Sequence, residues 1–124
     1  MARDFDRSRR VGEQIQRELS ELVRREIKDP RLGMVTISGV EVSKDFSTAR
    51  VFITVLGKER SAAEEDLEIL NHAAGHLRGL LGRSIRLRHI PKLSFFYDAA
   101  IDSGARMDAL IDAAVASDHH DKDE

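Results

Sequence analysis

The sequence contains no cysteine, no tryptophan and only two prolines in 124 residues. The absence of cysteine excludes disulfide bonds and thiolate-ligated metal sites, and it favours a reducing compartment. Five phenylalanines and one tyrosine are too few for base stacking on exposed aromatic rings to be the main mode of recognition. No stretch approaches the roughly 18 apolar residues of a membrane span. The first ten residues also hold no apolar run of signal-peptide type, so we expect a soluble, cytoplasmic protein.

The composition fits a single globular domain with a heavily charged surface, since 41% of the residues are hydrophobic and 34% are charged. The formal net charge of −2 hides an asymmetry. Residues 108–124 carry six acids and one base, whereas residues 69–97 carry five bases and no acid. We therefore predict a folded domain over residues 1–116 and an acidic, disordered tail over 117–124.

The N-terminal part predicts one long helix, capped by Ser8 and ended near Ile27 by the Asp29-Pro30 pair. Its core-facing stripe consists of Val11, Ile15, Leu19, Leu22 and Val23. The opposite stripe carries Arg10, Arg17, Arg24 and Lys28. This basic stripe either extends a nucleic-acid surface or is a solvated face on which Glu13 pairs with Arg17 and Glu21 with Arg25.

Two strands are expected next, over residues 33–42 and 49–56, and they are expected to pair antiparallel. A bulge is placed at Gly39, because the apolar residues before and after it have opposite parity. Asp45, in the loop between the strands, is interpreted as a turn residue.

A capping-box pattern, Ser61 to Glu64, predicts the start of a second helix. The glycine in Ala73-Ala74-Gly75 should break that helix, and a further helical piece should run to about Ser84. A third strand is expected in residues 85–97, and a short last helix around Met107. The order α-β-β-α-kink-α-β predicts an α+β fold with a three-stranded sheet and helices on one face, the plan of KH-like RNA-binding domains.

The helical piece after the break has two contrasting faces. Leu77, Leu80, Leu81 and Ile85 form an apolar face, and the other face holds Gly75, Gly79 and Gly82 between arginines. Each helical glycine costs about 1 kcal/mol relative to alanine, so three of them indicate a close approach by something. That partner is either a phosphate backbone attracted by the arginines or another element of the same chain.

Other local patterns carry less weight. Gly79-Leu-Leu-Gly82 has the spacing of the clamp loop of KH domains, but its leucines belong to the apolar face. His72 and His76 have the spacing of a zinc-binding pair, yet Ala73 stands where a zinc protease needs glutamate, and no third ligand is evident. No nucleophile-and-base arrangement or phosphate-binding glycine loop is present, so we expect no enzyme, no cofactor and no metal.

The sequence resembles the ribosome-binding factor A family, bacterial proteins of small-subunit maturation. The resemblance covers roughly residues 5–115 and is carried by the KDPRLG turn, the VEVSKD strand end and the RHIPKLSFFYD strand. It implies a KH-like fold in which an Ala-x-Gly kink, here Ala73-Ala74-Gly75, replaces the clamp loop. It also implies binding to the free 30S subunit and 16S ribosomal RNA late in assembly. Maturation of the 5′ end of that RNA, importance in the cold and a link to a GTPase are further implications.

The candidate RNA contacts are Lys28, Arg31, Ala73, Ala74, Gly75, Arg78, Arg83, Arg86 and Arg88. The protein is expected to be a monomer, with no membrane partner. Two alternatives remain open at this stage. One is a general KH-like RNA chaperone that binds many RNAs comparably, and the other is a small metallohydrolase built on His72 and His76.

Overall fold

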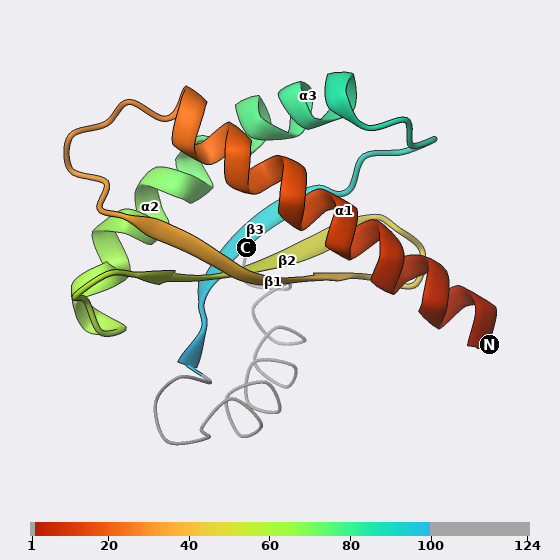
Figure 1. Ribbon diagram of the computed structural model, residues 1–124, viewed down its shortest axis with the longest axis horizontal. Helices are drawn as coiled ribbons and strands as arrows, with labels where there is room; N and C mark the ends of the chain where they lie inside the picture. The colour runs from red at the N-terminus through yellow and green to blue at the C-terminus, as the bar shows by residue number, and fades with distance from the viewer. Residues whose placement is uncertain (1, 100–124) are drawn as a thin grey trace, which may run out of the picture.

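The computed structural model describes residues 2–99 and has the predicted order of helices and strands (Figure 1). The predicted last helix around Met107 and the tail 117–124 lie outside the described residues. The elements are α1 (Ala2–Glu26), β1 (Val35–Val42), β2 (Thr48–Val55), the 3₁₀ turn η1 (Ser61–Ala63), α2 (Glu64–His72), α3 (Ala74–Ser84) and β3 (Lys92–Tyr97).

The three strands form one mixed sheet in the order β1-β2-β3. As predicted, β1 and β2 are antiparallel, while β3 runs parallel to β2 after the crossover through α2 and α3. The expected bulge is confirmed next to Gly39. Ile37 pairs with Ile53 and Gly39 pairs with Phe52, so Ser38 is the extra residue. The bulge reverses the parity of β1 and turns the apolar residues on both sides of it toward the same face.

All three helices cover one face of this sheet, which confirms the predicted α+β architecture (Figure 1). The core forms where the apolar stripe of α1 meets β2, whose residues Ala49, Val51, Ile53 and Val55 are buried. Four of the five predicted stripe residues of α1 are buried, and Val11 packs against them from the edge. The periodicity of the first helix therefore identified its buried face correctly.

The predicted start of the first helix was wrong. The helix begins at Ala2, and Ser8 lies inside it. The six residues before Ser8 that belong to the helix include no glycine or proline, so the helix has no reason to stop at a serine that it tolerates. The end was predicted within one residue, because α1 ends at Glu26 and the Ile27 amide still bonds to the Val23 carbonyl at 3.2 Å.

The capping box predicted from Ser61 to Glu64 does not form. Ser61 begins a 3₁₀ turn, α2 begins only at Glu64, and neither start has a side-chain cap. Arg60, the residue before Ser61, already has helical backbone angles of φ −50° and ψ −50°. Ser61 therefore lies within the helical turn, where its hydroxyl cannot take the capping role of a residue that precedes the helix.

Candidate nucleic-acid interface

A single residue, Ala73, separates α2 from α3, so the predicted break is confirmed. The Ala73 amide donates to the carbonyls of Ile69 and Leu70, both at 3.1 Å, and its own carbonyl accepts the Leu77 amide at 2.9 Å. Ala73 and Ala74 are half-buried against the core. The small residues thus let the chain turn close to the sheet, and Gly75 lies exposed at the first turn of α3.

The glycines of α3 separate into two kinds. Among residues 2–99, a Cβ added at Gly75 or Gly79 would have no atom within 4 Å apart from its chain neighbours and the nearby backbone of its own helix. A Cβ added at Gly82 would lie 3.4 Å from Cγ1 of Ile90. In the described part of the chain, Gly82 is therefore the one of these three glycines that has another segment packed beside it. Gly75 and Gly79 leave a strip of bare helix backbone open to the outside.

The opposite face of α3 belongs to the core. Leu77, Leu81 and Ile85 are buried, and Leu80 is half-buried. The Gly79–Gly82 stretch is part of a regular helix, and Leu81 is completely buried. It therefore lacks the loop conformation of a KH clamp. Its glycine spacing reflects which residues point outward from the helix.

Three of the predicted arginines, Arg83, Arg86 and Arg88, are exposed and close in sequence. Arg83 lies in the last turn of α3, and the other two lie in the loop that follows it and projects from one end of the molecule (Figure 1). Within residues 2–99 none of the three forms an ion pair. Arg78 is different, because its Nε and Nη2 donate to the Ile90 carbonyl at 2.9 and 2.7 Å.

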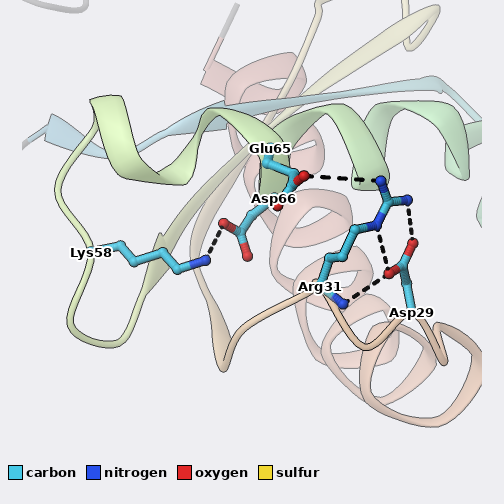
Figure 2. Close-up of polar contacts among 5 residues, drawn as sticks. All are labelled: Asp29, Arg31, Lys58, Glu65 and Asp66. Carbon is cyan, nitrogen blue, oxygen red and sulfur yellow. Dashed lines mark hydrogen bonds and ion pairs between the residues drawn. The ribbon is translucent and has the colours of Figure 1, made fainter.

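Arg31 lies apart from these arginines, beside α2 (Figure 2). Its Nη2 is 2.7 Å from Oδ2 of Asp29, its Nε is 3.1 Å from Oδ1, and its Nη1 is 3.9 Å from Glu65. Hydrogen bonds from the Arg31 side chain and backbone lower the pKa of Asp29 to about 2. The positive charge of Arg31 is therefore balanced locally, unlike that of Arg83.

The basic stripe of α1 is exposed, and Lys28 lies just beyond its end. The ion pairs predicted beside this stripe were assigned to the wrong partners. Glu21 bonds to Arg24, three residues along, and Arg25 bonds to Glu26. Residues three apart and residues four apart are both neighbours on a helix surface, so the sequence cannot decide whether Glu21 pairs with Arg24 or with Arg25.

The structure adds an ion pair that the sequence did not suggest, between the buried Asp66 of α2 and the partly exposed Lys58. Asp66 is completely buried and accepts hydrogen bonds from Nζ of Lys58 and from the Gly33 amide, both at 2.8 Å (Figure 2). Burial alone raises the pKa of Asp66, but the bonds from Gly33 and Lys58 outweigh it, and the pKa lies below its usual value. Asp66 thereby connects the turn after Pro30 to α2. A carboxylate spaced with the buried residues Ala63 and Leu70 is the only sequence signal that marks it.

Asn71 makes a second connection of this kind, from α2 to β3. Its Nδ2 donates to the Phe95 carbonyl at 3.2 Å, and its Oδ1 accepts the Phe95 amide at 2.8 Å. The amide side chain thus imitates a neighbouring strand at the outer edge of β3. These two bonds attach the end of α2, just before the kink at Ala73, to the edge of the sheet.

His72 and His76 are exposed on either side of the kink. Over residues 2–99, no group of three or more histidine, cysteine, aspartate or glutamate side chains is placed to hold a metal ion. In the same part of the chain, no helix has the length and apolar character needed to cross a membrane.

Comparison with known proteins identifies the family. The family model for ribosome-binding factor A matches residues 7–111. The chain is 57% identical over 127 residues to ribosome-binding factor A of Pseudomonas paraeruginosa, covering 100% of this chain and 98% of the relative. It is 58% identical over 120 residues to that of Azotobacter vinelandii, covering 95% and 93%.

Solved structures agree with the sequence relatives. The crystal structure of ribosome-binding factor A from Thermus thermophilus has a TM-score of 0.62 at 31% identity, over 73% of this chain and 94% of that one. A solution structure of a putative ribosome-binding factor A from Thermotoga maritima has a TM-score of 0.60 at 37% identity, over 68% and 79%. The chain belongs to the ribosome-binding factor A family.

Proposed function

We propose that this protein is a ribosome assembly factor that binds the free 30S subunit, and that it does so through the outer face of α3 and the loop after it. Family membership supports the ribosomal target. A further relative supports the particular subunit. A Thermus thermophilus ribosome-binding factor A homology model, 33% identical to this chain with a TM-score of 0.59, was fitted into a cryo-EM map of its complex with the 30S subunit.

The observation that carries the proposed interface is the pairing of bare backbone with unpaired positive charge. Gly75 and Gly79 offer no side chain to hold a partner away. Arg83, Arg86 and Arg88 are exposed without a carboxylate partner in the described part of the chain. A phosphate backbone fits both properties, because it can approach the helix closely and releases counterions when arginines neutralise it. Lys28 and Arg31 are proposed as peripheral contacts only, since Arg31 is already paired with Asp29.

In this proposal the factor acts by binding and has no catalytic step. It holds an immature conformation of 16S rRNA late in assembly, or blocks early engagement by translation components, and so assists maturation of the 5′ end. It works as a monomer in the cytoplasm, matters most in the cold and leaves with the help of a ribosome-associated GTPase. The acidic segment 117–124 stays outside the folded domain of residues 1–116.

Co-sedimentation with 30S, 50S and 70S particles at two salt concentrations tests this proposal. We expect salt-sensitive binding to 30S alone. Arg83→Ala combined with Arg86→Ala should weaken that binding. It should also reduce the magnitude of the negative slope of log affinity against log salt by about 1.4 to 1.8, the value for two lost phosphate contacts.

The matched control is Arg50→Ala combined with Arg60→Ala, which removes the same charge elsewhere. Arg50 lies between the core residues Ala49 and Val51, so it points to the sheet face away from the helices. This control should keep the wild-type slope. Equal binding to all particles and to unrelated RNA would instead favour a general RNA chaperone. Full 30S affinity in the Arg83/Arg86 variant would refute the proposed interface.

A further inference from the structure

The loop between α3 and β3, residues 85–91, is held firmly at both ends. Ile85 is buried at its start, and Pro91 is fully buried at its end. The side chain of Ile90 lies against α3 at Gly82, 3.4 Å from where a Cβ would be. Between these anchors Arg86, Arg88 and His89 are exposed. The loop therefore presents its charged side chains from a backbone fixed to the domain on both sides.

Arg78 supplies the polar part of that attachment. Two nitrogens of its guanidinium group, Nε at 2.9 Å and Nη2 at 2.7 Å, converge on the single carbonyl oxygen of Ile90. Hydrogen bonds from a charged donor are stronger than neutral ones, and two of them to one acceptor define its position. The side chain spans from the second turn of α3 to the far end of the loop, twelve residues later.

We infer that Arg78 is a positioning residue of the RNA interface, which acts through Ile90 and makes no phosphate contact of its own. It keeps the loop in the conformation that presents Arg86 and Arg88 to the RNA. This inference rests on the proposed function. It separates Arg78 from Arg83, Arg86 and Arg88, although the sequence predicted all four as RNA contacts. A loop already ordered before binding loses less conformational entropy when it meets its partner.

The two kinds of role predict different salt dependence. Loss of a phosphate contact makes the negative slope of log affinity against log salt shallower by about 0.7 to 0.9. Loss of loop order lowers affinity by a similar factor at every salt concentration, because the bound state still contains the contacts of Arg86 and Arg88. The slope is then unchanged.

Glutamine and methionine at position 78 separate these roles. Glutamine places its Nε2 at the same point along the side chain as Nε of arginine, so Arg78→Gln removes the charge and keeps one bond to Ile90. Methionine has a similar length and no donor. We expect Arg78→Met to weaken 30S binding about three- to tenfold with an unchanged salt slope, and Arg78→Gln to stay within about twofold of wild type. The backbone ¹⁵N heteronuclear NOEs of residues 86–89 should fall in the methionine variant only.

An equal loss of affinity in the two variants, with a salt slope reduced in magnitude by about 0.7 to 0.9 in both, would show that Arg78 contacts phosphate directly. Full affinity in both variants would show that the loop needs no help from Arg78. Either result overturns the inference. Arg86→Ala combined with Arg88→Ala tests the proposed function separately. If that variant binds 30S at wild-type strength, the interface itself is wrong. If it binds weakly while glutamine and methionine behave alike, only the positioning role is lost.

Discussion

Replacing Asp66 by asparagine should destabilise the fold by an amount that follows from its contacts. The carboxylate is completely buried and accepts two hydrogen bonds, from the Gly33 amide and from Lys58. A hydrogen bond to a charged group contributes about 1.5 to 3 kcal/mol. Asparagine has the same shape, but the two donors reach different oxygens of Asp66, and the amide nitrogen that replaces one of these oxygens cannot accept a hydrogen bond. Lys58 is 32% exposed and can turn toward water, so its part is small. We expect a loss of about 2 to 3 kcal/mol at neutral pH.

The pH dependence gives this prediction a second test. The pKa of Asp66 lies below its usual value in the folded protein. A lowered pKa in the folded state stabilises the protein above the unfolded-state value of about 3.9, and this stabilisation is lost as pH falls through the folded-state value. The difference between wild type and Asp66→Asn should therefore be constant at neutral pH and shrink below about pH 4.

Urea unfolding at a series of pH values measures both quantities, and an unchanged m-value would confirm that the same surface is exposed on unfolding. Asp29→Asn is the matched control, because Asp29 also pairs with a base but at the surface. It should cost much less than Asp66→Asn at neutral pH. Equal stability of Asp66→Asn and wild type, or a difference that persists unchanged in acid, would refute the role assigned to this carboxylate.

Three further substitutions test other contacts. Gly12→Ala should lower the free energy of unfolding by about 1 to 3 kcal/mol in urea, because its Cβ would lie 2.7 Å from the Val40 carbonyl oxygen and push α1 off β1. Asn71→Ala should cost about 1 to 3 kcal/mol by the same measure, because the Phe95 amide and carbonyl lose their partner. Gly79→Gln should stabilise the isolated protein by about 0.5 to 1 kcal/mol and yet weaken 30S binding, because no described residue outside the helix lies beside that glycine and the new side chain would meet the proposed RNA partner. Unchanged stability in either of the first two, or unchanged binding in the third, would contradict these assignments.

Local patterns were sufficient for much of the fold. The apolar stripe of α1, the bulge beside Gly39 and the break at Ala73 each follow from a few neighbouring residues, and each was predicted correctly. The errors arose where neighbouring residues allow several outcomes. Ser8 is compatible both with a cap and with a helix interior. Ser61 was expected to precede its helix as the cap, but it is the first residue of the helical turn, so its side chain does not cap.

The candidate site was predicted as a set of residues without their individual roles. Three of the predicted contacts are exposed, as RNA-binding side chains must be: Arg83, Arg86 and Arg88. Arg31 is instead paired with Asp29, and Arg78 is bonded to the Ile90 carbonyl. Those partners depend on how the chain folds back after Pro30 and after α3. No spacing rule reveals a bond from a side chain to a backbone carbonyl twelve residues away. The same limit applies to Asp66, whose partner Gly33 is 33 residues away.

In the proposed function, this protein contacts ribosomal RNA with the outer face of α3 and the loop that follows it. A cryo-EM map of the protein bound to immature 30S particles tests it most directly. We predict rRNA backbone against Gly75 and Gly79, phosphates within hydrogen-bond distance of Arg83, Arg86 and Arg88, and Arg78 still bonded to Ile90. A map that places the exposed face of the sheet or the α1 stripe against the RNA, with α3 facing solvent, would refute the proposed interface.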